Sequence, residues 1–288
     1  MMKNYIKDFK KIDISRKYKL PKKIEYCKKC VLSNQRPRTV FYKGICNGCY
    51  HEEYKNSVDW DKKKKEFKIF LKKFRKKDGN YDCIVPSSGG KDSSVVAYKL
   101  KYEYGMNPLT VTWSPNSYTD IGFKNFQNLI KKGLPNVLGS PPGDVNRRFV
   151  KDALIEMGDC FLPFIYGQHN FPAQVAVKYN IQLIVDGENA EFQYGGDFKN
   201  AGKKNWNTKQ QISYWFSKYN LDFWLKKGYT KKDLFSYSAP SEKELKKSKV
   251  QRVFWDFYHK WSKQKHYYYA QDKVDFTPNE DRSEGTYS

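Results

Sequence analysis

Hydrophobic and polar residues change their spacing several times along the middle of the chain. Short apolar runs bounded by turn-forming residues predict strands, and segments with apolar residues three or four positions apart predict helices. The predicted strands are Tyr81–Pro86, Leu109–Trp113, Asn136–Leu138 and Ile181–Asp186. The predicted helices are Ser93–Tyr104, Ile121–Lys132, the segment from an N-cap at Asp144 to Met157, which ends at Gly158, and Asn170–Tyr179. This alternation predicts βαβ units that build a parallel sheet covered by helices on both faces.

The chain on either side of this region has a different character. We expect a basic leader at residues 1–24, a cysteine ribbon at 25–56, a connecting helix at 57–80 and a catalytic domain at 81–288. The helical spacing of apolar residues from Phe67 to Phe74 indicates the connecting helix. After Asn189 the chain is polar and aromatic, and Gln210–Leu225 and Val250–His266 are predicted as aromatic-rich helices. The expected fold class is α/β, with a Rossmann-like parallel sheet, a small N-terminal ribbon and C-terminal aromatic helices.

The composition is that of a globular protein. Hydrophobic residues make up 39% and aromatic residues 17% of the 288 positions, which excludes an aromatic-poor disordered chain. No run of 18 apolar residues occurs, so no transmembrane helix is expected. The basic N-terminus also lacks the apolar stretch of a signal peptide, and we expect a cytoplasmic protein.

The net charge of +23 raises the question of a nucleic-acid partner. Lysine supplies 46 of the 54 basic residues and is spread along the chain, whereas arginine, which favours bidentate phosphate contacts, occurs 8 times. A weak RNA-binding surface and a Lys-rich composition without any nucleic-acid role both explain this pattern. We favour the second explanation and leave the first one open.

The segment from Val85 to Ser94 carries the most specific chemistry in the chain. It follows a predicted strand and opens a predicted helix, where glycines allow a tight turn and free N–H groups point at an anion. Lys91 adds a positive charge, and Asp92 can cap the helix or hold Mg²⁺ beside phosphates. The residues expected to contact the nucleotide are Ser88, Gly89, Gly90, Lys91, Asp92, Ser93 and Ser94.

The order of these residues separates them from two commoner phosphate loops. It is neither GxxxxGK[ST] nor GxGxxG, but it matches SGGxDS and so resembles the PP-loop ATP pyrophosphatases. The resemblance implies a sheet of the PP-loop (adenine nucleotide alpha-hydrolase-like) type. It also implies that ATP is cleaved between its α and β phosphates, which leaves AMP on the substrate. The alternative, a Ser/Gly turn that caps an ordinary helix, is weakened by the preceding strand and the full match.

A second polar turn follows the apolar strand that ends at Asp186. The carboxyl ends of parallel strands lie at one edge of a sheet, so Gly187 and Glu188 are expected beside the phosphate loop. Glu188 would bind Mg²⁺ or orient a nucleophile, and it completes a predicted catalytic set with Lys91 and Asp92. An ordinary β-turn explains the same residues, and only the neighbouring phosphate loop favours a site.

Two CxxC pairs lie near the N-terminus, at Cys27–Cys30 and Cys46–Cys49, with 15 residues between them. Four thiolates in a tetrahedral array suit Zn²⁺, and a ribbon with so little core would draw its folding energy from the metal. Gly48 is expected to ease the second turn, and His51 is expected at the surface. An iron–sulfur cluster is the alternative, whereas a redox role is weaker because two pairs together indicate a closed structural site.

The chain resembles the N-acetyl sugar amidotransferase family of bacterial surface-polysaccharide and flagellar-glycan pathways. The resemblance rests on the two CxxC pairs with a nearby Arg36-Pro37, Ser88–Ser93, Gly187-Glu188-Asn189 leading to Tyr194-Gly195-Gly196, and Glu280–Tyr287. The phosphate loop is shared with all PP-loop enzymes, whereas Gly187–Gly196 and Arg282–Tyr287 are more selective. Family members usually continue beyond the last of these motifs, so we expect this chain to be C-terminally short.

The resemblance implies that ATP activates the oxygen of an acetamido group on a sugar or a nonulosonic acid. Ammonia would then replace AMP and leave an acetamidino group, for the synthesis of lipopolysaccharide O-antigen or flagellar glycan. The implied cofactors are ATP, Mg²⁺ and Zn²⁺. The implied partners are the acetamido sugar, free or nucleotide-linked, and a separate glutaminase subunit with its cyclase-like partner, which supplies ammonia.

Two other functions stay open at this point. A zinc-ribbon PP-loop enzyme that modifies tRNA, such as a thiolase or a lysidine-synthase-like enzyme, would share both motifs and explain the charge. It predicts a reactive cysteine in the catalytic domain and a GHNADD-like motif where this chain has Gly187–Glu191, so it ranks second. A non-catalytic zinc-ribbon module would leave the phosphate loop unexplained. His169 and Asn170 are expected to open a helix, and both helix capping and contact with a substrate explain them. Arg147 and Arg148 could meet an anionic sugar nucleotide, but we favour a position facing solvent.

Overall fold

The computed structural model describes most of the 288 residues of the chain. The described residues are 21–36, 39–193, 196, 200, 202–206, 215–216 and 219–280. Most of the expected basic leader and the motif Arg282–Tyr287 lie outside them, as do Pro37, Tyr194 and Gly195. Within the described ranges, no helix is both long enough and apolar enough to cross a membrane.

The chain forms two compact units. The ribbon unit consists of the described residues of Met1–Val58 and Asn189–Lys203, and the sheet unit consists of those of Asp59–Glu188 and Lys204–Ser288. The chain therefore leaves the sheet unit directly after Glu188 and returns to it at Lys204. A short segment far from the cysteine pairs in sequence thus belongs to the same compact unit as they do.

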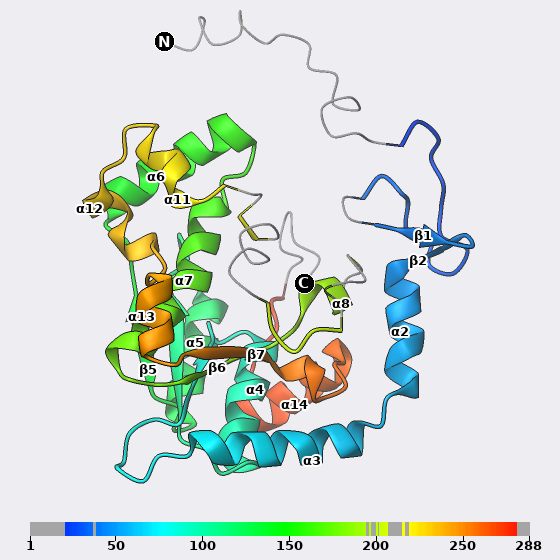
Figure 1. Ribbon diagram of the computed structural model, residues 1–288, viewed down its shortest axis with the longest axis horizontal. Helices are drawn as coiled ribbons and strands as arrows, with labels where there is room; N and C mark the ends of the chain where they lie inside the picture. The colour runs from blue at the N-terminus through cyan, green and yellow to red at the C-terminus, as the bar shows by residue number, and fades with distance from the viewer. Residues whose placement is uncertain are drawn as a thin grey trace, which may run out of the picture. The chain divides into compact units, whose positions relative to one another are not determined.

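A five-stranded parallel sheet forms the centre of the sheet unit (Figure 1). Its strands are β3 (Cys83–Pro86), β4 (Pro108–Trp113), β5 (Asn136–Gly139), β6 (Leu183–Asp186) and β7 (Gln251–Phe254), in the spatial order β5-β4-β3-β6-β7. From β3 the chain builds outward through β4 to β5 on one side, and β6 and β7 lie on the other. The strand order therefore reverses between β3 and β6. Open parallel sheets bind ligands at such a switch point, beyond the carboxyl ends of the strands.

The two faces of the sheet bury against different helices. On one face, Cys83 and Val85 pack with side chains of α3 (Trp60–Leu71), α4 (Lys91–Tyr102) and α14 (Lys263–Val274). On the other face, Ile84 packs with α7 (Leu162–Lys178), as the two-residue period of a strand requires. Because both faces are covered, the strands are nearly continuous apolar runs, and the predicted α/β class with a parallel sheet is confirmed.

Further described helices complete the sheet unit. They are α5 (Asp120–Lys131), α6 (Gly143–Met157), α11 (Leu221–Leu225), α12 (Lys231–Leu234) and α13 (Glu242–Lys247), with 3₁₀ turns η2 (Lys72–Phe74), η3 (Phe235–Tyr237) and η4 (Trp255–Phe257). An aromatic cluster joins α6 and α7 to α11: the ring of the fully buried Phe149 lies 6.0 Å from Tyr166 and 4.8 Å from Trp224. The aromatic C-terminal segment is therefore core, as the sequence predicted.

The prediction of one helix at Val250–His266 is wrong. Residues Gln251–Phe254 form β7, which pairs with β6 from Leu183↔Gln251 to Asp186↔Phe254, and the next helix, α14, begins at Lys263. The aromatic residues of this segment have a spacing that fits a helix, but pairing with β6 satisfies the backbone of an edge strand. The predicted helix Gln210–Leu225 lies partly outside the described residues, and α11 covers only its last part.

Two helix starts also differ from the predictions. Helix α7 begins at Leu162, with Pro163 in its first turn, so His169 and Asn170 lie inside the helix and do not open it. Pro172 lies inside this helix, although proline is usually found in the first turn, so the local sequence favours a later start than the one observed. Helix α6 is capped by Pro142, and Asp144 lies in its first turn, whereas Gly158 ends it in the left-handed conformation as expected.

The ribbon unit combines a hairpin, a helix and a short distant segment. Strands β1 (Phe41–Tyr42) and β2 (Ile45–Cys46) are antiparallel, and Lys43 and Gly44 connect them with positive φ angles of 50° and 78°. Helix α2 (Asn47–Ser57) follows β2 directly, so Gly48, which was expected to ease the turn of the second cysteine pair, lies in the first turn of this helix. Helix α8 (Ala190–Gln193) belongs to the same unit.

Contacts of Phe192 attach the distant segment to α2. The ring of Phe192 lies 5.5 Å from that of His51 and 6.0 Å from that of Tyr54. Lys55, which is 4% exposed, donates to Gln193 Oε1 at 3.0 Å. His51 is therefore buried in this unit, which corrects the expected surface position.

Candidate functional site

The phosphate loop connects β3 to α4 at the switch point of the sheet. Gly89 has a φ of 87°, and a Cβ atom there would lie 2.6 Å from the backbone nitrogen of Phe126, so only glycine fits. Ser87 Oγ donates to Ser93 Oγ at 2.9 Å and Ser93 Oγ donates to the Gly90 carbonyl at 3.2 Å, which ties the loop together. Gly90 is the N-cap of α4 and makes no side-chain cap bond, so the N-terminal end of this helix is open to an anion.

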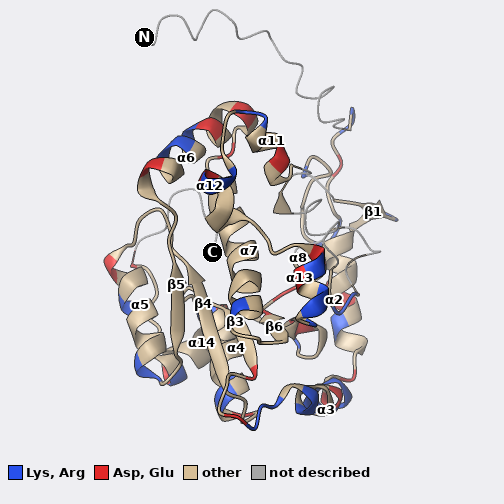
Figure 2. Cartoon of the chain, turned by 60° about the vertical axis from the view of Figure 1, so that its left-hand side comes forward, with Lys and Arg blue, Asp and Glu red and all other residues tan. Residues whose placement is uncertain are grey.

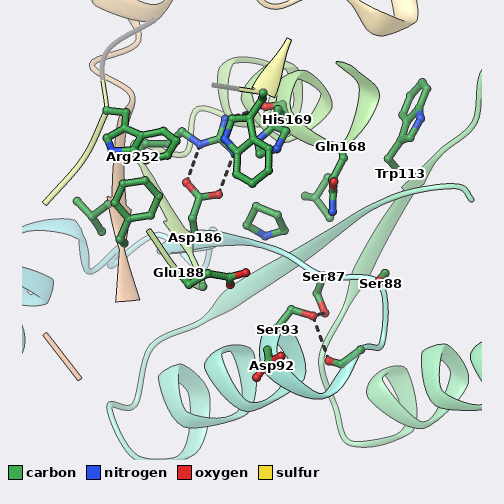
Figure 3. A pocket seen from close by; sticks show the side chains of 18 of the residues that line it. Ser87, Ser88, Asp92, Ser93, Trp113, Gln168, His169, Asp186, Glu188 and Arg252 are labelled. Carbon is green, nitrogen blue, oxygen red and sulfur yellow. Dashed lines mark hydrogen bonds and ion pairs between the residues drawn. The ribbon is translucent and has the colours of Figure 1, made fainter. Parts of the chain in front are cut away.

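A cavity of about 470 Å³ lies beyond the carboxyl ends of β3 and β6 (Figure 3). The candidate residues that line it are Ser88, Gly90, Lys91, Asp92, Ser93, Gly187 and Glu188. Gly89 and Ser94 do not line it: Gly89 shapes the loop and Ser94 is buried within α4. The tertiary structure therefore places the phosphate loop and the turn after β6 around one space, as the position of both turns after strands predicted.

Asp92 is held between two cationic or hydrogen-bonding groups. Lys91 Nζ lies 2.9 Å from Asp92 Oδ2, and His266 Nδ1 lies 2.9 Å from Asp92 Oδ1. Burial raises the pKa of the Asp92 carboxyl, but the hydrogen bonds from His266 and Lys91 outweigh burial and leave the pKa below its usual value. The carboxylate is therefore fixed in orientation and negatively charged at neutral pH.

His266 is a residue of this site that the sequence did not indicate. It lies in the first turn of α14, is 7% exposed, and its ring packs edge-on against Trp261 at 4.4 Å. Helix α14 packs against α4, with Ala270 and Val274 in the same core as Val95 and Val96. Since 174 residues separate His266 from Asp92, no local pattern could have joined them.

A second pair of charges lies at the carboxyl end of β6. Arg252 of β7 donates from Nε and Nη2 to the two carboxylate oxygens of Asp186 at 2.8 and 2.9 Å, and from Nη1 to the His169 carbonyl at 2.7 Å (Figure 3). Both side chains are more than four-fifths buried. Arg252 neutralises Asp186 through both carboxylate oxygens, whereas Asp92 and Glu188 line the cavity together with the phosphate loop and are the carboxylates that could meet a metal–nucleotide complex.

The His169 imidazole lines the same cavity. It stacks on Trp215 with ring centroids 4.4 Å apart. Removal from water lowers its pKa to about 3, and the positive charge of Arg252 acts in the same direction. The ring is therefore neutral at physiological pH. For His169 the sequence left helix capping and contact with a substrate open, whereas Arg252 was not singled out, because a helix was expected where it lies.

The four cysteines of the two CxxC pairs meet in the ribbon unit. Their sulfur atoms all lie within 4.8 Å of one another, with 3.8 Å between Cys27 and Cys49 and 3.5 Å between Cys30 and Cys46. Sulfurs bound at 2.3 Å to one tetrahedral zinc ion would be about 3.8 Å apart. The donor set and its spacing therefore fit a single zinc ion, and they leave little space for the several iron and sulfide atoms of a cluster.

The environment of Cys27 favours a thiolate. Burial raises the pKa of its thiol, but backbone N–H groups of Cys46 and Lys29 donate to Sγ at 3.2 and 3.4 Å, and the pKa falls to about 6. Burial and the crowded neighbouring thiols raise the pKa of Cys46 and Cys49. A bound divalent cation would reverse this effect by stabilising all four thiolates.

Other candidates from the sequence lie away from the cavity. Arg148 donates to Asp233 at 3.0 Å and is half exposed, which fits the expected solvent-facing role. Cys83 is fully buried in β3, as expected for a core cysteine, and Cys160 is exposed.

Comparisons with known proteins give weak similarities. No family model matches the chain. The uncharacterized protein MJ1599 of Methanocaldococcus jannaschii is 32% identical over 107 residues, which are 36% of this chain and 38% of that protein. The match thus spans well under half of that relative.

Two solved structures show a partial likeness. One is described as a predicted subunit of tRNA methyltransferase from Methanocaldococcus jannaschii, with 16% identity, a TM-score of 0.36, and 66% of this chain and 73% of that chain covered. The other is NMN synthetase from Francisella tularensis, with 16% identity, a TM-score of 0.35, and coverage of 73% and 96%. At these TM-scores neither neighbour establishes the fold or the activity of this chain.

Proposed function

We propose that the protein is a PP-loop ATP-dependent ligase that converts the acetamido group of a sugar into an acetamidino group. One observation supports this most strongly: an SGGKDS loop at the switch point shares a cavity with Gly187 and Glu188 of the turn after β6. Both motifs belong to the resemblance with N-acetyl sugar amidotransferases.

The reaction needs a better leaving group than an amide oxygen. The acetamido oxygen attacks the α-phosphorus of ATP, the bond to the β-phosphate oxygen breaks, and pyrophosphate leaves. Ammonia then adds to the activated carbon and loses its extra protons, and AMP leaves with the former acetamido oxygen. The products are an acetamidino sugar, AMP and pyrophosphate, so the atoms of the amide, ammonia and ATP are all accounted for.

The residues of the loop would position and neutralise the phosphates. The open N-terminus of α4 and the charge of Lys91 would face the polyphosphate, and the hydroxyl groups of Ser88 and Ser93 would add donors. Asp92 and Glu188 would hold Mg²⁺, which would neutralise charge on the leaving pyrophosphate. As an alternative role, Glu188 would orient the incoming ammonia.

The proposed ligand of the four cysteines is a structural zinc ion, because a closed set of four sulfurs leaves no open coordination position for chemistry. Ammonia would come from a separate glutaminase. Within the described residues, the two cysteines outside the ribbon are unsuited to a glutaminase nucleophile, since Cys83 is buried in a strand and Cys160 makes no hydrogen bond to a histidine that could activate it.

A tRNA-modifying ligase is the second candidate, and the net charge of +23 favours it. Figure 2 shows that Lys and Arg positions occur along several helices, interspersed with Asp and Glu positions on α3 and α6. Such a mixed surface is a weaker argument for RNA than one continuous basic face would be. The sugar amidotransferase therefore remains the preferred proposal.

The test measures pyrophosphate release from ATP with ammonium present, using a panel of acetamido sugars and nonulosonic acids and, separately, bulk tRNA. Sugar-dependent release with an acetamidino product on mass spectrometry supports the proposal. Asp92→Ala and Lys91→Ala should lower the rate at least about 100-fold, because positioned charges of this kind contribute a few kcal/mol to catalysis. Lys99→Ala, on the same helix but outside the cavity, is the matched control.

Release that depends on tRNA alone would replace the proposal with the second candidate. Pyrophosphate release that is unchanged in both Asp92→Ala and Lys91→Ala would contradict the assignment of this cavity as the nucleotide site.

A further inference from the structure

A second cavity adjoins the candidate nucleotide cavity within the sheet unit. It encloses about 610 Å³ and is bounded by residues of α7, β6, β7 and α13. The two cavities have four lining residues in common, namely His169, Asn205, Trp206 and Arg252. They are therefore two chambers that meet at one shared wall.

The shared wall is held in place by strong contacts. Arg252 is fixed by both oxygens of Asp186 and by the His169 carbonyl, so its side chain cannot swing into either chamber without losing three hydrogen bonds. The charges of Arg252 and Asp186 compensate each other, and the His169 ring is neutral. A second substrate at this wall would therefore meet a rigid surface with little net charge beside the nucleotide.

Two kinds of surface line the second chamber. The partly exposed side chains of Leu221, Leu245 and Val250 supply apolar area, and the carboxamide of Asn170 supplies hydrogen-bonding capacity. Asn170 Nδ2 donates to the Tyr237 carbonyl at 2.7 Å, which fixes the orientation of the carboxamide.

The oxygen of this carboxamide is available to a ligand. Asn170 is only 7% exposed, yet within the described part of the chain its Oδ1 accepts no hydrogen bond. Oδ1 also does not belong to the atoms that are shut off from all accessible space. An acceptor that is fixed in orientation, lacks a protein partner and is accessible from a cavity can receive the N–H or O–H group of a ligand.

We infer that the second chamber binds the acceptor substrate, an acetamido sugar whose methyl group and ring face lie on the apolar wall and whose N–H donates to Asn170 Oδ1. This inference rests on the proposed function. The chemistry requires the acetamido oxygen to reach the α-phosphorus of ATP, and a nucleotide in the first cavity leaves the adjoining chamber for the acceptor. Such an arrangement brings both substrates together at the shared wall.

The test fills the chamber without touching the shared wall. Leu245→Trp on α13 and, independently, Ala239→Trp would add bulk to this chamber only. Both variants should raise the KM for the acetamido sugar at least about tenfold while the KM for ATP stays within about twofold. The matched control is Leu154→Trp on the exposed surface of α6, where Leu154 is 53% exposed.

The outcomes separate this inference from the proposed function. If wild-type pyrophosphate release is stimulated by an acetamido sugar but both chamber variants keep the wild-type KM for that sugar, the acceptor binds elsewhere. A rise in the KM for ATP in both variants would instead place the nucleotide in this chamber and overturn the inference. If no acetamido sugar stimulates pyrophosphate release by the wild-type protein, the proposed function itself is wrong, and the inference about the acceptor chamber, which rests on it, is withdrawn with it.

Discussion

The ribbon unit and the sheet unit are stabilised by different physical means. In the described part of the chain, all three clusters of buried apolar side chains lie in the sheet unit. The ribbon unit buries few apolar side chains, among them Cys27, Cys46, Ala190 and Phe192. Apolar burial alone can stabilise the first unit, whereas the second is too small for that and has four sulfurs within 4.8 Å instead.

This difference shows how a small unit can matter to a site in a larger one. The segment Asn189–Lys203 belongs to the ribbon unit, and it begins at the residue after Glu188, which lines the nucleotide cavity. Phe192 and Gln193 contact His51 and Lys55 of α2, and Cys49 lies in the first turn of the same helix. We therefore expect any order that a bound metal imposes on α2 to extend along the chain to Asn189, the residue that follows Glu188.

The largest predicted effect is that removal of the metal unfolds the ribbon unit and leaves the sheet unit folded. A chelator should abolish hydrogen-exchange protection in residues 25–58 and in Asn189–Gln193, because structural zinc contributes about 10–16 kcal/mol to the folding of small zinc domains. All seven tryptophans lie in the sheet unit, so their fluorescence should stay constant during chelation. The Cys30→Ser variant should have the same effect without a chelator.

Two results would contradict the conclusion that the two units are stabilised by different means. Metal-free protein with full protection at residues 25–58 would mean that the ribbon unit folds without an ion. A simultaneous change in tryptophan fluorescence would mean that the two units do not differ in how they are stabilised.

The next effect concerns a contact inside the sheet unit. His266→Leu should raise the Mg²⁺ concentration needed for half-maximal pyrophosphate release and lower kcat/KM for ATP by about tenfold or more, because a charge-assisted hydrogen bond contributes roughly 1.5–3 kcal/mol. The role is one of positioning, since His266 acts through Asp92. His266→Asn should restore most of the loss, because its amide nitrogen can donate to Asp92 Oδ1 as Nδ1 does.

Equal losses in the leucine and asparagine variants would contradict the positioning role. They would indicate that His266 matters only for packing against Trp261. Melting temperatures of both variants, measured by tryptophan fluorescence, provide the control for packing.

The smallest effect is an acid sensitivity of the sheet unit. Burial lowers the pKa of His259 to about 3, and its ring lies 3.5 Å from that of Trp255. In the unfolded chain His259 binds a proton near pH 6.5, whereas in the folded chain its ring stays neutral down to about pH 3. The free energy of unfolding is therefore unaffected by His259 above pH 6.5 and decreases as the pH falls from 6.5 toward 3. At pH 5 the loss is about 2 kcal/mol.

The measurement follows tryptophan fluorescence during thermal unfolding at pH 7 and pH 5. His259→Phe keeps a ring against Trp255 but removes the titrating group, so the melting temperature should fall less between the two pH values than in the wild type. The variant loses the contact between His259 Nε2 and the Tyr104 hydroxyl, and its absolute stability is therefore not the readout. An unchanged pH dependence would show that other groups, such as His169, account for the acid sensitivity.

Local sequence patterns were sufficient to predict the strands that consist of one continuous apolar run. Strands β3, β4 and β6 are short apolar runs bounded by turn residues, and such runs are recognisable without knowledge of their partners. The phosphate loop and the cysteine pairs were recognisable for the same reason, because their chemistry depends on neighbours a few residues apart. The grouping of Lys91 with Glu188 followed from one topological rule about the ends of parallel strands.

The amino-acid sequence by itself determined the α/β class, the phosphate loop and the four-cysteine set, because each depends on local spacing. Only the tertiary structure decided that Gln251–Phe254 is a strand, that Arg252 binds Asp186, and that His266 reaches Asp92. The last two contacts span 66 and 174 residues. Partners so far apart are brought together by sheet pairing and helix packing, and these depend on the whole hydrophobic core rather than on any local pattern.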